Sequence, residues 1–161
     1  MRNSTKYLAA VAALSVGLAS PFMVVAQVPQ KSSPRLADVM GVLQSRHSKL
    51  WTAAQQQNWE LAAYQMELVK AGLADAIGLY ADIPVTNVTM IDGPLKSIDG
   101  AIAARNGAAF GKAFGELTTG CNSCHQSVGR GFIVMTVPTA SPFGNQSFAP
   151  RPGQGRDVTR R

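Results

Sequence analysis

The residues best suited to chemistry lie in one five-residue stretch, Cys121-Asn122-Ser123-Cys124-His125. The pattern C-x-x-C-H is the attachment signature of c-type haem. On a helix, the second cysteine at i+3 and the histidine at i+4 project from the same face as the first cysteine. Two thiols can then bond to the two haem vinyl groups while the imidazole reaches the iron. We therefore expect one covalently attached haem c per chain, bound by Cys121, Cys124 and His125, with His125 as an iron ligand.

Two other chemistries use a C-x-x-C pair, a dithiol redox site and half of a zinc site. Thioredoxin-like redox chemistry belongs on a βαβ framework, which the sequence pattern does not show. A zinc site needs a fourth ligand, and His47 is the only histidine or cysteine outside the motif. Because no set of nucleophile, base and orienting residue is visible, we expect an electron-transfer protein and not an enzyme.

The N-terminus favours an exported protein. Residues 1–26 have a basic start, an apolar run from Leu8 to Ala19 and a small-residue site at Val24-Val25-Ala26, which is typical of a secretory signal peptide. An uncleaved membrane anchor is the alternative, but a span needs about 20 consecutive apolar residues and Pro21 interrupts this run. We expect cleavage and export to a compartment where covalent haem attachment takes place.

Four helical patterns follow the signal peptide. The first begins at Ser33-Pro34 and runs to about Gln57, and the second is capped by Asn58. Residues 84–92 are expected to be a connection. The third helix begins near Pro94, and the fourth follows Asn106 and ends before Gly129 and Gly131. The apolar stripes recur at steps of three and four: Leu36, Met40, Leu43, His47, Leu50 and Ala54; Ala62, Met66, Val69, Leu73, Ile77 and Tyr80; Leu95, Ile98 and Ile102; Phe110, Phe114, Leu117, Cys121, Cys124 and Val128.

Short links between amphipathic helices predict an all-α fold, an antiparallel up-down-up-down four-helix bundle over residues 27–131. Residues 132–161 are rich in proline and glycine, which predicts an extended arm on the bundle and a loose tail. We expect the apolar side chains of this arm to cover part of the bundle: Phe132, Ile133, Val134, Phe143 and Phe148.

The charge distribution excludes nucleic acid as a partner. The 161-residue chain has fifteen Lys and Arg against nine Asp and Glu, a net charge of +6. Two of those cations precede the apolar run at the N-terminus, and four arginines follow Pro150. The middle of the chain is almost neutral, so it lacks the concentrated basic face that phosphate binding needs.

A C-x-x-C-H near the C-terminal end of a four-helix bundle resembles the class II c-type cytochromes, the cytochrome c prime type. The resemblance covers about Leu36 to Arg130, and the segment from Leu50 to Ala62 is also similar to small haem proteins of this shape. It implies a periplasmic monohaem protein, often a homodimer, with periplasmic or membrane redox partners. Cys121 and Cys124 would be the thioether anchors and His125 the proximal ligand. The family usually has a basic residue four positions after the histidine, whereas here Gly129 stands there and Arg130 follows.

The sixth iron position separates an electron carrier from a gas-binding protein. Met40 and His47 both lie on the inward stripe of the first helix, about 10 Å apart along its axis. In an antiparallel pair, the level of His125 matches the first turns of that helix, so we expect Met40 to be the second iron ligand. An open iron, His47, Met135 and Met90 remain alternatives, and most methionines at helical spacing only fill core gaps.

The expected function is that of an exported one-electron carrier. The alternatives are a haem protein that binds nitric oxide or carbon monoxide, and a haem subunit that docks through its proline-rich arm. Trp51 and Trp59 are expected to pack and not to relay electrons. His47 is expected to be a partly exposed histidine beside Arg46 and Lys49. For these two cations and for Arg130, two interpretations stay open: pairing with the haem propionates, or a place on a solvated helix face.

Overall fold

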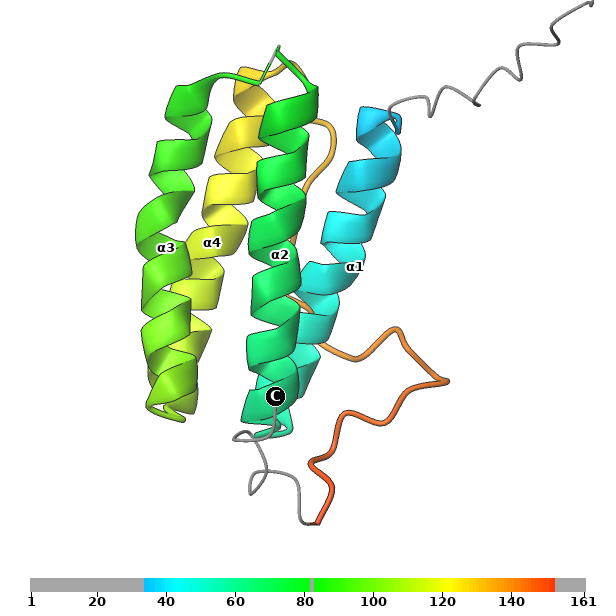
Figure 1. Cartoon of the computed structure of the whole chain (residues 1–161), viewed down its shortest axis with the longest axis vertical. Coiled ribbons are helices and arrows are strands. Elements are labelled where there is room, and N and C mark those ends of the chain that lie inside the picture. Colours follow the sequence, from blue (N-terminus) through cyan, green and yellow to red (C-terminus); the bar gives the residue numbers. More distant parts are fainter. Residues whose placement is uncertain (1–33, 82, 153–161) are drawn as a thin grey trace, which may run out of the picture. The chain divides into compact units, whose positions relative to one another are not determined.

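The computed structural model describes residues 34–81 and 83–152, which form four α-helices and no strand. The helices are α1 (Leu36–Gln55), α2 (Trp59–Leu79), α3 (Val85–Ala103) and α4 (Gly107–Ser127). Figure 1 shows them side by side as a helical bundle, with the α1–α2 and α3–α4 turns at the same end. The prediction of an all-α fold is confirmed. The predicted signal peptide and most of the predicted tail lie outside the described residues.

The two turns at this end are built alike. Asn58 and Asn106 each accept a hydrogen bond from a backbone N–H of the helix that follows, at Leu61 (3.1 Å) and Ala109 (3.0 Å). The residues before them, Gln57 and Arg105, have φ angles of 57° and 51°. Both Asn caps agree with the sequence prediction. The resulting tight reversals place Trp59 and Phe110 beside each other, with ring centroids 6.3 Å apart.

The predicted start of α1 is too early. The helix begins at Leu36, Arg35 is its N-cap without a side-chain cap bond, and Pro34 precedes the helix. Ser33 lies outside the described residues. Arg35 pairs instead with Asp38 in the first turn, Nε to Oδ2 at 2.9 Å. An aspartate in the first turn interacts favourably with the helix dipole, which supports a start at this position.

The predicted start of α3 is wrong. The helix begins at Val85, so most of the expected connection over residues 84–92 is helical and Pro94 lies inside the helix. An interior proline costs about 3 kcal/mol because it lacks an N–H and crowds the preceding turn. The extra turns bury Ile91 against α4. A Cβ atom added at Gly120 of α4 would lie only 2.6 Å from the Cγ2 atom of Ile91. The burial of Ile91 offsets the cost of Pro94 inside the helix. The sequence prediction considered only that cost, so it placed the start of the helix too late.

The core is concentrated toward one end of the bundle. We call the end with the α1–α2 and α3–α4 turns the turn end, and the opposite end, where the C-x-x-C-H motif lies on α4, the motif end. The largest fully buried side chains pack from the turn end to the middle of the helices: Phe110, Phe114, Leu50, Met66, Ile98 and Leu117. Of the described apolar residues toward the motif end, only Ala76 and Ile91 are buried.

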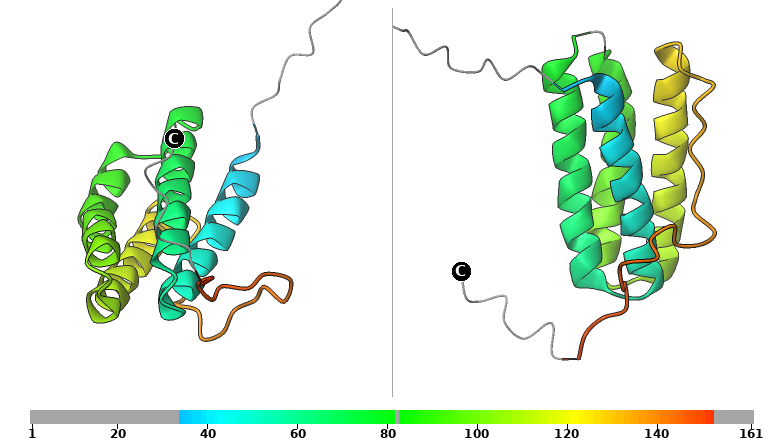
Figure 2. Two further views of the ribbon diagram at one scale, coloured as in Figure 1. Left: turned by 60° about the horizontal axis from the view of Figure 1, so that its bottom comes forward. Right: turned by 90° about the vertical axis from the view of Figure 1, so that its right-hand side faces the viewer.

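The residues after α4, here the C-terminal segment (residues 129–152), contain no helix or strand. They run back beside α4 toward the turn end (Figure 2). Phe148 of this segment is 5% exposed and joins the core, and its carbonyl accepts a hydrogen bond from Asn58 Nδ2 at 3.2 Å. Phe143 is half-buried beside it, but Phe132, Ile133 and Val134 are exposed. The expectation that all five apolar side chains cover the bundle is therefore wrong for these three.

Candidate functional site

The motif occupies the last turns of α4 at the motif end. The side chains of Cys121, Cys124 and His125 are half-buried, and Cys121 packs against the edge of the hydrophobic core. Burial, and to a smaller extent the neighbouring Cys124, raises the pKa of the Cys121 thiol to about 11. No disulfide joins the two cysteines. Dithiol redox sites lower the pKa of their attacking cysteine, so the environment of Cys121 argues against that chemistry.

The ring of His125 is oriented by the C-terminal segment. Its Nδ1 atom lies 2.8 Å from the carbonyl oxygen of Ile133. A carbonyl only accepts, so this contact places a proton on Nδ1, and in the neutral ring the lone pair is then on Nε2. Metal-bound histidines commonly donate their second ring N–H to a carbonyl in this way. The geometry thus prepares Nε2 of His125 to bind a metal.

The end of α4 directs the chain back toward His125. Gly129 has a φ of 69°, a left-handed conformation that glycine adopts without a steric penalty. The Gly129 N–H bonds to the Gln126 carbonyl (3.1 Å), and the Arg130 N–H bonds to the His125 carbonyl (2.7 Å). This is a Schellman motif, which ends the helix at the glycine that the sequence predicted.

Asn122, the first residue between the two cysteines, contacts the same segment. Its Nδ2 atom donates to the carbonyl of Met135 (2.9 Å), and its Oδ1 atom accepts from the Met135 N–H (2.7 Å). By contrast, the hydroxyl of Ser123 bonds to Thr119 within its own helix, at 3.1 Å. Asn122 is a site residue that the sequence reasoning missed. Its pairing with a backbone some thirteen residues away leaves no pattern in the sequence.

The helices around the motif leave apolar side chains incompletely buried. Val42, Leu79 and Met90 are exposed, at 56%, 46% and 50%. Other apolar side chains of α1, α2 and α4 in this half are only half-buried: Leu36, Val39, Met40, Leu43, Leu73, Ile77 and Val128. The described residues therefore do not fill the motif end of the bundle with a core of their own.

Met40, the predicted second ligand, lies in this incompletely packed half. It is half-buried on the first turns of α1. Two of the alternatives, Met90 on α3 and Met135 in the C-terminal segment, also belong to the motif end, half-exposed and half-buried respectively. The structure thus brings all three candidate thioethers to the same end as His125.

His47 differs from its prediction, because it is 4% exposed and not on a solvated face. Its Nε2 atom lies 2.9 Å from Thr118 Oγ1. The Thr118 hydroxyl donates to the Phe114 carbonyl at 2.8 Å, so it accepts from the His47 Nε2–H. The His47 ring also packs on Phe114 with centroids 4.3 Å apart. Two helices, α1 and α4, therefore enclose this histidine between them.

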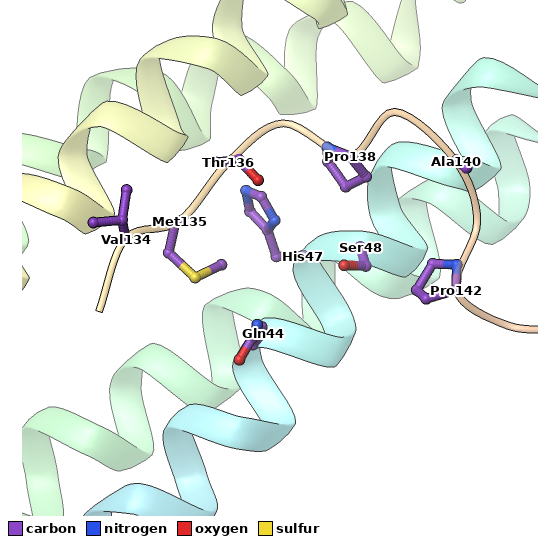
Figure 3. A pocket seen from close by; sticks show the side chains of 9 residues that line it. All are labelled: Gln44, His47, Ser48, Val134, Met135, Thr136, Pro138, Ala140 and Pro142. Atoms are coloured by element: carbon purple, nitrogen blue, oxygen red, sulfur yellow. The ribbon is translucent and has the colours of Figure 1, made fainter. Parts of the chain in front are cut away.

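The remaining ring nitrogen of His47, Nδ1, is buried without a hydrogen-bond partner among the described residues. Burial lowers the pKa of His47 to about 4, so the ring is neutral near pH 7. A cavity of about 150 Å³ lies beside the ring, between α1 and the C-terminal segment. Figure 3 shows the ring extending from α1 toward Thr136, with Gln44, Ser48 and Met135 around it.

The other residues singled out in the sequence have structural partners. The prediction of packing is confirmed for Trp51, whose ring lies 4.9 Å from that of Phe114, and for Trp59 beside Phe110. The Lys49 ammonium lies 4.9 Å from the centre of the Phe143 ring. These contacts belong to the filled part of the bundle and not to the motif.

No protein-family model matches this chain, and neither a curated protein nor a solved structure matches it. Within residues 34–81 and 83–152, no helix is long and apolar enough to cross a membrane. In the same part of the chain, no three His, Cys, Asp or Glu side chains come together in a way that would hold a metal ion.

Proposed function

We propose that this protein is an exported monohaem c-type cytochrome that carries single electrons in the periplasm. The observation that carries the proposal is the C-x-x-C-H motif, which lies on one face of α4 at the end of the bundle that its own side chains leave incompletely packed. A covalently bound haem supplies an iron that cycles between two oxidation states. The signal-like N-terminus supports export, since it would deliver the chain to a compartment where haem is attached.

The residues at the motif end fit such a group. Cys121 and Cys124 would hold it by thioether bonds, and His125 would bind its iron through Nε2. The other ring nitrogen, Nδ1, donates to the Ile133 carbonyl. The half-buried apolar side chains of α1 and α2 would provide the walls. Burying apolar surface contributes about 25 cal/mol per Å², so a flat apolar ring among these side chains would stabilise this half.

The up-down-up-down order of the helices is part of the proposal, and a pair of contacts supports it. From Trp51 back to His47 along α1, the partner on α4 moves forward from Phe110 to Thr118, to which His47 is hydrogen-bonded. This bond places His47 of α1 level with Thr118 of α4. With α1 and α4 antiparallel, seven residues back along α1 is Met40 and seven residues forward along α4 is His125. Met40 would then lie on the level of His125, as the spacing of the sequence predicted.

Met40 is therefore our proposed second iron ligand. A thioether is a soft ligand that favours ferrous iron and raises the reduction potential. It would also close the iron to small gases, which suits an electron carrier. His47 is less suitable, because its Nε2–H is bonded to Thr118 and its ring is packed between α1 and α4.

Covalent attachment is tested by expression in a haem-attaching host. We expect haem to remain on the denatured protein in gels and mass spectra, and Cys121→Ala to leave a single thioether. Ser123→Ala is the matched control, because Ser123 lies in the same motif and its hydroxyl bonds to the Thr119 carbonyl within α4. Complete extraction of the haem from the wild type by acid and organic solvent would refute the proposal.

The sixth position is tested by Met40→Ala and His47→Ala, read by optical spectra with and without carbon monoxide. Loss of the low-spin spectrum in Met40→Ala alone, with a lower reduction potential and new carbon monoxide binding, supports the electron carrier. Loss only in His47→Ala would assign a bis-histidine iron. A wild type that is already high-spin and binds carbon monoxide would instead identify a gas-binding protein.

A further inference from the structure

The stretch of the C-terminal segment that faces His125 is not held by apolar burial. Phe132 and Val134 are 80% and 68% exposed, and Ile133 is exposed as well. Phe132 and Val134 therefore point largely into solvent, and Ile133 points partly into solvent, while their backbone follows α4 (Figure 2). Some other interaction must keep this backbone beside the helix.

Hydrogen bonds from α4 provide that interaction. Asn122 both donates to and accepts from the backbone of Met135, so its amide pairs with this residue as a neighbouring strand would. Three residues further along the helix, His125 donates to the carbonyl of Ile133. Two residues of chain are long enough to make both contacts, because three residues of helix rise about 4.5 Å and two residues of fully extended chain span about 6.6 Å.

We infer that Asn122 is a positioning residue: by pairing with Met135 it holds residues 130–135 against α4, so that the Ile133 carbonyl accepts the Nδ1 proton of His125 and strengthens that ligand. The inference rests on the proposed function, since it assigns the effect to the iron. Within the motif, the two positions between the cysteines then have different roles. Position 122 holds the C-terminal segment, and position 123 does not.

The chemical consequence follows from the Nδ1–H···O=C bond. A carbonyl that accepts this proton places more electron density on the imidazole and makes Nε2 a better donor. A better donor favours ferric iron, which lowers the reduction potential. Without Asn122, the exposed backbone would leave α4 and water would replace the carbonyl. The reduction potential should then rise.

The test uses the full-length haem-loaded protein and the variant Asn122→Ala, with Ser123→Ala as control. We expect a positive shift of the reduction potential, a changed resonance of the His125 ring N–H and faster hydrogen exchange of the Met135 amide in Asn122→Ala. Ser123→Ala should match the wild type in all three measurements. An unchanged potential and unchanged Met135 exchange in Asn122→Ala would overturn the inference.

A second pair of variants breaks the same contact from the other side. Met135→Pro removes the N–H that donates to Asn122, whereas Met135→Ala keeps it. The potential should be more positive in Met135→Pro than in Met135→Ala, by about the shift that Asn122→Ala produces, because both variants lose the thioether but only Met135→Pro loses the N–H. Equal shifts in both Met135 variants would assign the effect to the side chain and overturn the inference.

The proposed function and this inference fail in different ways. A wild type that carries no covalent haem refutes the proposed function, and the inference about iron falls with it. Covalent haem in every variant, together with equal potentials, refutes only the role of Asn122.

Discussion

The two ends of this bundle differ in how they are filled, although the same helices run through both. At the turn end, aromatic side chains from α1, α2 and α4 pack on one another; Phe110 and Phe114 are fully buried and their ring centroids lie 5.7 Å apart. At the motif end, apolar residues with the same helical spacing remain half-buried. The stripe of apolar residues predicts which face of a helix points inward. It does not predict whether another side chain fills the space that the face meets.

The difference predicts unequal costs of truncation, and this is the largest effect we expect. In protein made without haem, Phe114→Ala at the turn end should lower the free energy of unfolding by about 4 kcal/mol, as is usual for a buried phenylalanine. Leu79→Ala at the motif end should cost less than about 1 kcal/mol, because the side chain is already half-exposed. Urea denaturation measures both changes. Equal losses would show that the motif end has a full core of its own.

A second prediction concerns acid stability, to which the buried His47 contributes. Its pKa is about 4 in the folded protein, against 6.5 when unfolded. The unfolded chain therefore binds more protons between these values, so stability is full above pH 6.5 and falls as the pH drops toward 4. The loss should reach about 3 kcal/mol, since each pKa unit corresponds to 1.36 kcal/mol.

His47→Gln is the matched control for this effect, because glutamine is polar but does not titrate. Denaturation at several pH values should show a smaller fall in stability between pH 6.5 and 4 in the variant than in the wild type. If both proteins lose stability in parallel over this range, His47 is not the group responsible.

The sequence predicted the elements of the fold better than their ends. Both Asn caps and the glycine that ends α4 were recognisable, because each is a local interaction between residues close in sequence. The start of α3 was not, since the burial of Ile91 against α4 depends on a helix elsewhere in the chain. Tertiary packing outweighed the local signal of Pro94.

The candidate site divides in the same way. The spacing of Cys121, Cys124 and His125 is visible in the sequence itself, and the prediction of covalent haem rests on it. The partner that orients His125 was not visible, because the carbonyl of Ile133 is a backbone atom. The burial of His47 was not visible either, because it depends on Thr118 of another helix. Neighbouring cations made His47 look like a surface residue, although its place on the inward stripe indicated the opposite.

The smallest predicted effect lies at a close contact between α3 and α4 toward the motif end. A Cβ at Gly120 would lie 2.6 Å from Ile91 Cγ2, whereas nothing lies within 4 Å of one at Gly115, on the same helix. Gly120→Ala should therefore destabilise the protein by about 1–3 kcal/mol through overpacking. Gly115→Ala should stabilise it by up to about 1 kcal/mol, because alanine favours the helix.

Thermal and urea denaturation of the two alanine variants distinguish the general effect of helix propensity from the local effect of overpacking against Ile91. If Gly120→Ala is as stable as Gly115→Ala, the Ile91 side chain can move aside without cost, and the motif end is looser than the structure indicates. Opposite signs for the two substitutions would instead show that the packed part of the bundle extends along α3 and α4 as far as this contact. The incompletely filled space would then be bounded on that side by Ile91 and Gly120, directly before the first cysteine of the motif.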